Sequence, residues 1–141
     1  MGKIDIGRVI LGGIVAGIIV DIFEYVLNGI ILASDWNTLT AAHNLPMMGM
    51  NQIIVFNLVG PVFGIAAVWS YAAMRPRFGA GPRTAVRAAL LIWVLGYVLA
   101  DAFPTLIGLF TMSMFVTLVA VGLVEIVVAT LAGAYFYKEA A

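Results

Sequence analysis

Two carboxyl groups and an amide interrupt a long apolar stretch near the N-terminus, within the segment VDIFEYVLNG (20–29). Asp21, Glu24 and Asn28 follow one another at intervals of three and four residues, so a helix would place all three on one face. Ionisable groups in such a stretch can bind a proton or a cation. They can also act as neutral hydrogen-bonding groups that join neighbouring helices.

Other apolar stretches of the chain repeat this feature. Glu125 lies near the centre of one stretch, and Asp101 and Asn57 lie in the outer parts of two others. No Lys or Arg lies at the same depth, although a charged Asp at a helix centre costs roughly 2.5–3.5 kcal/mol. We therefore expect these carboxyl groups either to be protonated or to be compensated by a cation or a water-filled cavity. The candidate proton- or cation-binding residues are Asp21, Glu24, Asn28, Asn57, Asp101 and Glu125.

The elements that must position these residues are transmembrane helices. The chain has 141 residues, of which 64% are hydrophobic and 10% are charged, and its mean hydropathy is +1.12. Soluble domains are about 45–50% apolar and about 25% charged, so lipid is the expected solvent. Stretches of about 20 apolar residues predict spans at roughly 7–32, 51–74, 85–105 and 113–137. The predicted fold is an all-α integral membrane four-helix bundle that forms one domain, 1–141.

Basic residues predict the orientation of this bundle. All of them lie before the first span, in or beside the loop between the second and third spans, or after the fourth span: Lys3, Arg8, Arg75, Arg77, Arg83, Arg87 and Lys138. With four spans, these three regions share one side of the membrane. The positive-inside rule then places both termini in the cytoplasm. The expected location is the bacterial inner membrane, with the chain crossing it several times.

Small residues follow the same helix faces as the polar ones. Gly13 and Gly17 precede Asp21 at intervals of four residues, and Gly60 and Gly64 form a similar pair in the second span. Such small-xxx-small patterns allow two membrane helices to approach closely. We expect these four glycines to be helix-packing positions. The faces that they form also suggest association into a homo-oligomer or a larger membrane complex.

The predicted outer connections hold the only histidine and most of the methionines. The segment HNLPMMGMNQ (43–52) contains His43, Met47, Met48 and Met50, and Met112 and Met114 precede the fourth span. Imidazole and thioether groups are suitable ligands for Cu(I), and His43 could instead ligate a haem or another pigment. Methionine also packs well into irregular apolar gaps, which explains the cluster without a metal. Before this segment, Asp35 could cap a short interfacial helix that Pro46 would end.

Several classes of function have little support in the residues. The formal net charge is zero and there is no Cys, so neither a nucleic-acid-binding surface nor a thiolate site is expected. The chain shows no His pair for zinc, no spacing typical of a Ser-His-Asp triad and no dinucleotide-binding loop. An enzyme is therefore not expected. No cofactor is firmly implied, and the expected partners are membrane lipid and other membrane proteins.

Three segments of the chain carry a resemblance: GRVILGGIVAGIIVDIFEYVLNG (7–29), YAAMRPRFGAGPRTA (71–85) and GLVEIVVATLAGAYFYKE (122–139). Together they resemble an uncharacterised family of small bacterial four-helix integral membrane proteins. The resemblance covers most of the chain and implies the same topology. It carries no known activity, so it transfers no functional residue.

Three functions follow from these observations. The first is a non-enzymatic subunit, or homo-oligomeric component, of a membrane assembly, in which the polar face gives packing specificity. The second is a proton- or cation-coupled transporter or channel that uses Asp21, Glu24 and Glu125. The third is an outer-face copper or redox-cofactor accessory that uses His43 and the methionines.

Overall fold

The computed structural model describes residues 3–138, which form helices and connecting loops without any strand. The helical elements are α1 (Ile6–Val26), η1 (Leu27–Ile31), α2 (Ala33–Ala42), α3 (Met50–Phe78), α4 (Pro82–Trp93), η2 (Val94–Val98), α5 (Leu99–Leu106) and α6 (Met112–Phe136). The elements η1 and η2 are single π-helical turns. The predicted all-α class is confirmed.

Four helices are long and apolar enough to cross a membrane, as the sequence predicts. They are Ile6–Ile31, Met50–Phe78, Pro82–Leu106 and Met112–Phe136, within a few residues of the predicted spans. The first and third are compound, because a π turn continues α1 and another joins α4 to α5. These dimensions and this composition indicate a membrane protein.

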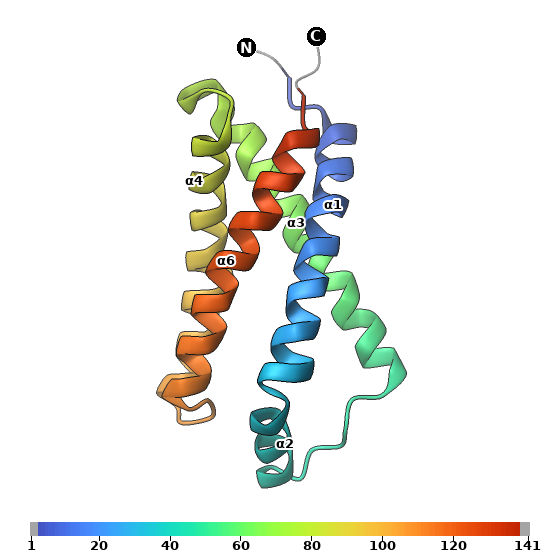
Figure 1. Ribbon diagram of the computed structural model, residues 1–141, viewed down its shortest axis with the longest axis vertical. Coiled ribbons are helices and arrows are strands. Elements are labelled where there is room, and N and C mark those ends of the chain that lie inside the picture. The colour runs from blue at the N-terminus through green and yellow to red at the C-terminus, as the bar shows by residue number, and fades with distance from the viewer. Residues whose placement is uncertain (1–2, 139–141) are drawn as a thin grey trace.

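The bundle has two distinct ends (Figure 1). Both ends of the chain and the α3–α4 loop lie at one end, and α2 and the α5–α6 loop lie at the other. We call the part next to the chain ends the terminal half and the part next to α2 the distal half. Every basic residue that the sequence analysis singled out therefore belongs to the terminal half.

Glycines form the crossing of α1 and α3. A Cβ on Gly17 would overlap the backbone of Pro61, and a Cβ on Gly13 would overlap Ile65. On the other helix, Gly60 faces Gly17 and Gly64 faces the carbonyl oxygen of Gly13. All four predicted packing glycines are buried at this crossing. The two backbones approach closely there because the four glycines carry no side chain.

The core of the terminal half joins all four spans. Its buried residues are small or β-branched in the main, such as Ala16, Ala67, Val68, Ala88 and Ala129. The indole Nε1 of a tryptophan on α4 donates to a main-chain oxygen on α6, Trp93 to Val119, at 2.8 Å. Close packing and this interhelical hydrogen bond fix α4 against α6.

Aromatic and basic side chains close the terminal half. The Arg75 guanidinium lies over the rings of Tyr71 and Tyr137, at 5.8 and 5.3 Å from their centroids. The Tyr137 hydroxyl also accepts a hydrogen bond from the main-chain N–H of Asp5 at 3.4 Å. These contacts join α3 to the segments that flank α1 and α6.

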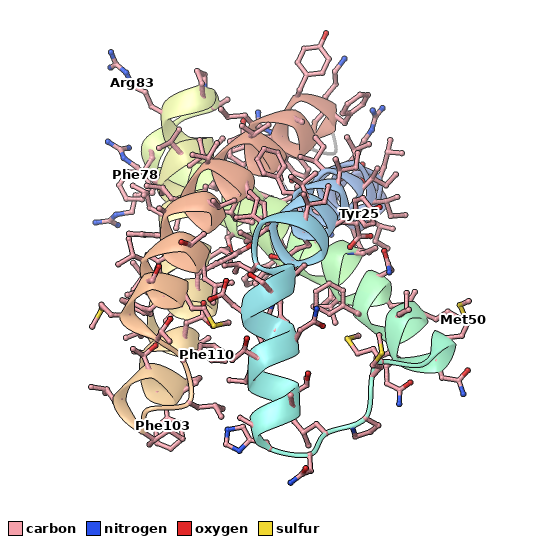
Figure 2. All side chains as sticks on the ribbon, turned by 60° about the horizontal axis from the view of Figure 1, so that its bottom comes forward. Tyr25, Met50, Phe78, Arg83, Phe103 and Phe110 are labelled. Carbon is pink, nitrogen blue, oxygen red and sulfur yellow. The ribbon has the colours of Figure 1, made fainter. Side chains whose placement is uncertain are left out.

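The distal half is more open, because α3 diverges from the other spans toward its N-terminus (Figure 1). Every residue from Met50 to Val59 is exposed, and Met50 lies far from α2 and α6 in Figure 2. A small apolar cluster instead joins η1 and α2 to α6, through Leu27, Leu32, Met114 and Leu118. The helices are therefore close together at one end of the bundle and separated at the other.

The expected short helix after the first span is present as α2, with Asp35 in its first turn. No side chain caps it, so the predicted Asp35 cap is wrong. The third span begins at Pro82, with Gly81 as its N-cap residue. The absence of the Asp35 cap does not change the position of any span.

Candidate functional site

The two π turns place the first residues of the site. Asn28 lies in η1 and Tyr97 lies in η2, and each turn closes with a main-chain hydrogen bond across five residues, such as Leu32 N–H to Leu27 O at 2.8 Å. A π turn accommodates one more residue than an α-helical turn and is frequent at functional sites. The turn η1 lies next to α2 in the distal half, and η2 lies near the middle of its span, where Tyr97 is buried against the main core.

Glu125 of α6 is the most buried acid of the described chain, with 0% of its surface exposed. Its Oε1 accepts a hydrogen bond from the Tyr97 hydroxyl at 2.7 Å. The carboxyl group of Glu24, on α1, lies within hydrogen-bonding range of the Glu125 carboxyl group. Gly122, one turn earlier on α6, leaves room for the Tyr97 ring to lie against that helix. Three spans thus meet at one acid.

A chain of hydrogen bonds runs from this acid pair toward the distal end. Asn28 Nδ2 donates to Glu24 Oε2 at 2.5 Å. Trp36 Nε1, on α2, donates to Asn28 Oδ1 at 2.8 Å. The series Trp36, Asn28, Glu24, Glu125 and Tyr97 therefore connects the distal helix with the middle of the bundle. We call these five residues the polar chain.

The contact between Glu24 and Glu125 constrains their protonation. An ionised carboxylate can only accept hydrogen bonds, and Glu125 Oε2 receives none from the N–H and O–H groups of residues 3–138. Two negative charges about 4 Å apart repel by about 4 kcal/mol at an effective dielectric constant of about 20. A hydrogen bond between two carboxyl groups instead needs one proton, which both share. The chemistry of the two carboxyl groups is therefore compatible with one bound proton between them.

A cavity of 240 Å³ lies beside the polar chain. Its lining includes the carboxylic acids Asp21, Glu24 and Asp101, the amide of Asn28, and no basic residue. The lining also contains five aromatic side chains, those of Trp36, Phe56, Phe63, Tyr97 and Phe110. The cavity is therefore both acidic and aromatic.

The remaining two acids lie at the edges of this site. Asp21 Oδ1 lies next to Gly60, where α1 and α3 begin to diverge. Asp101, on α5, is partly exposed and acts electrostatically on Glu24 and Tyr97. Together with the acid pair, they give the site four carboxyl groups from three spans.

Five of the six candidate polar residues thus lie in or beside one site, and Asn57 does not. Asn57 is exposed, and its side-chain N–H group donates to the Ile53 carbonyl oxygen of its own helix at 2.8 Å. Because α3 diverges from the bundle, its polar face at this level does not meet α1. Asn57 therefore belongs to the open part of α3.

Sequence reasoning missed two members of the polar chain as site residues, Trp36 and Tyr97. Trp36 lies outside the apolar spans, so the spacing within the first span gives no sign of its contact with Asn28. Tyr97 shares a helix with Asp101 at an interval of four residues, and this spacing is the signal that could have included it.

The proposed copper ligands are not gathered in one place. His43 and Met114 line a second cavity of 300 Å³ between α2 and the start of α6. Met47 and Met48 lie on the connection to α3 and Met50 is the first residue of that helix. All three are exposed, Met47 by 88%, and none of them lines that cavity. Within residues 3–138, no three side chains of the types His, Cys, Asp and Glu form a group that could hold a metal ion.

Comparison with known proteins adds no further assignment. No protein-family model, no curated protein and no solved structure matches the chain. The resemblance to small four-helix membrane proteins consequently supplies no site residue. The function must be argued from the polar chain and its cavity.

Proposed function

We propose that this protein is a proton-coupled cation carrier whose proton site is the Glu24–Glu125 pair. The observation that supports this function is the contact between two carboxyl groups from different spans, at a level of the bundle without any basic residue. Such a pair holds one proton in the absence of substrate. A cation that enters the adjacent cavity can replace this proton without changing the charge of the site.

The surroundings of the pair support the same function. The charged or titratable groups that act on Glu24 and Glu125 come from three elements: Asp21 on α1, Asp101 on α5 and Tyr97 on η2. None of them supplies a positive charge. The site therefore favours a cationic occupant, and ionisable residues that face the inside of a membrane bundle typically mark ion or proton pathways.

The basic residues at one end of the bundle support an orientation for the carrier. By the positive-inside rule, they favour a terminal half at the cytoplasmic face of a bacterial inner membrane. The distal half, with α2 and the cavity, then faces the other side. In this orientation the glycine crossing of α1 and α3 lies between the cavity and the cytoplasm.

Purified protein in liposomes tests the proposal. An imposed pH gradient is followed with a pH-sensitive dye while sodium, potassium or an organic ammonium ion is added. Wild-type protein should dissipate the gradient with at least one of these cations, and Glu24→Gln and Glu125→Gln should not. Asp35→Asn, on α2 outside the cavity, is the matched control and should behave as wild type.

An infrared measurement tests the shared proton directly. The C=O stretch of a protonated carboxyl group should be present in the wild type and lost or shifted in Glu24→Gln and in Glu125→Gln. Unchanged spectra in both variants would contradict the proton site. A wild type that dissipates the gradient with none of the cations would contradict the carrier function.

A second candidate is a subunit, or homo-oligomeric component, of a membrane assembly without enzymatic activity. The observation that favours it is the face of α3 from Met50 to Val59, which contacts no other span closely enough to be buried. Native extraction into lipid nanodiscs followed by mass measurement tests this candidate. A mass of one chain with no co-purified protein would exclude it, and it would leave the carrier function unaffected.

A further inference from the structure

We infer that the cavity beside the polar chain is a binding site for a small organic cation that carries one aromatic or similarly apolar group. This inference rests on the proposed carrier function and names its substrate class. It is argued from the lining, the size and the position of the cavity.

The lining combines the two groups that recognise organic ammonium ions. Aromatic faces attract a cation that has few hydrogen-bond donors, and cages of such rings bind quaternary ammonium groups. The carboxyl groups of Asp21, Glu24 and Asp101 supply the countercharge. A bare sodium or potassium ion would need a shell of oxygen ligands, which a cavity with five aromatic side chains does not offer.

Two edge-to-face ring pairs hold the aromatic walls in place. Phe63 and Tyr97 form one pair, with centroids 5.7 Å apart, and Trp36 and Phe110 form the other at 5.6 Å. Phe110 lies in the α5–α6 loop on the side of α2 (Figure 2). Trp36 is also fixed by its hydrogen bond to Asn28. The rings are thus preorganised by contacts within the protein, which reduces the entropy lost on binding.

The volume limits the ligand to a small one. Pockets for drug-sized molecules measure about 300–1,000 Å³, whereas this cavity measures 240 Å³. A single ring with a trimethylammonium group is a suitable size, and larger polycyclic cations are not. Phe56 and Val59 of the open part of α3 contribute to the lining. The organic cation can therefore enter from the lipid, with its apolar group between α3 and the other spans.

The exchange balances in charge. The shared proton leaves the Glu24–Glu125 pair when one monovalent cation enters the cavity, and the site then holds the same net charge. No bond other than that to the proton is broken. Binding should therefore release about one proton for each cation and should weaken as the proton concentration rises.

Benzyltrimethylammonium binding to the detergent-solubilised full chain tests the inference by calorimetry. Titrations in two buffers with different heats of ionisation give the number of protons released, which should be close to one. Neopentylbenzene has the same shape without the charge and should not displace the ligand. Sodium and potassium chloride at the same concentration should not compete either.

Ring substitutions localise the binding to this cavity. Phe63→Leu and Phe110→Leu should each weaken benzyltrimethylammonium binding between twofold and tenfold, since each removes one aromatic wall. Phe103→Leu is the matched control, because Phe103 is 67% exposed on α5 and does not line the cavity. The control should bind as wild type, and circular dichroism should show that all three variants keep their helical content.

Different experimental outcomes would overturn the organic-cation site and the carrier function. A wild-type spectrum without the band of a protonated carboxyl group overturns both proposals. A protein that keeps this signal and dissipates a pH gradient with sodium or potassium, but does not bind benzyltrimethylammonium, overturns only the organic-cation site. Binding that survives in Glu24→Gln without proton release, or that is equal in all three Phe variants, also overturns it.

Discussion

The terminal and distal halves of the bundle are built from the same four spans in opposite ways. In the terminal half, glycine and alanine bring the helix backbones into contact, and the buried polar side chains there include small hydroxyl groups such as those of Thr84 and Thr130. In the distal half, α3 diverges and the space beside α1 and α5 holds acids, an amide and aromatic rings. Close packing at one end allows an open polar site at the other, because the spans are already held in position.

This contrast explains how a small membrane protein can tolerate several buried acids. Hydrogen bonds between membrane helices contribute only about 0.6 kcal/mol on average, too little for the polar chain to hold the bundle together alone. The van der Waals contacts of the glycine crossing supply the stability instead. Substitutions in the two halves should therefore differ in kind, with loss of folding in one and loss of binding in the other.

The largest effect is expected at the crossing of α1 and α3. Gly17→Leu would place a side chain against the backbone of Pro61 and should lower the free energy of unfolding by about 3 kcal/mol, as for severe overpacking. Gly29→Leu is the control, because a Cβ there meets only the Tyr25 ring at an ordinary 3.7 Å. Unfolding titrations in mixed micelles measure both. Equal stability of the two variants would contradict the distinction between the halves.

A smaller loss is expected where the two halves meet. Glu125→Ala removes the acceptor of the Tyr97 hydroxyl, the partner of Glu24 and a fully buried side chain. The combined loss of packing and hydrogen bonds should lower the free energy of unfolding by about 2 kcal/mol. The same micelle titration measures it, with Glu125→Gln as a shape-preserving control that should lose less than half as much. An alanine variant as stable as wild type would show that the polar chain is independent of the fold.

Removal of a single hydroxyl should have a still smaller effect. Tyr97→Phe deletes the 2.7 Å hydrogen bond to Glu125 Oε1 and keeps the ring against Gly122 and Phe63. The expected loss of stability is about 0.6 kcal/mol, the average for a hydrogen bond between membrane helices. The infrared band of the protonated pair should shift at the same time, since one acceptor oxygen loses its donor. A stability loss above about 2 kcal/mol would assign Tyr97 to the packed core instead.

The smallest effect is expected at Asn57, which shares the level of the cavity but lies on the open part of α3. Asn57→Leu removes only a hydrogen bond to its own helix. Stability should change by less than about 0.5 kcal/mol, as for most surface substitutions, and the pH-gradient assay should give the wild-type rate. A strong loss of transport would mean that α3 closes onto the other spans during the carrier cycle.

Much of this architecture could be predicted from the sequence. Long apolar runs give the four spans, and the four-residue spacing of Gly13 and Gly17 with that of Gly60 and Gly64 identifies the residues that meet at the α1–α3 crossing. The sequence also predicts that the acids face inward, because a carboxyl group exposed to lipid is costly. These signals are local and depend only on residue type and helical period.

The features that the sequence does not predict depend on departures from a regular, straight helix or on tertiary contacts. Asn57 has the correct spacing, but the divergence of α3 separates it from Glu24, and no local pattern records the angle between two helices. The π turns shift Asn28 and Tyr97 relative to an ideal α-helix, so helical-wheel reasoning misplaces their neighbours. Trp36 joins the site through tertiary contact alone.

The π turns at 27–31 and 94–98 differ from the α-helical segments in how they tolerate the loss of one residue. Each residue of an α-helix advances the side-chain direction by about 100°, whereas a π turn takes up one more residue than an α-helical turn. Excising one residue from either π turn would therefore restore an ordinary helical turn and leave the direction of the next segment nearly unchanged. Excising one residue from the α-helical segment between Gly17 and Glu24 would instead rotate Glu24 and Asn28 by about 100°, away from Glu125. A deletion is thus tolerated in the π turns and disruptive in the α-helical segment that joins the glycine crossing to the cavity.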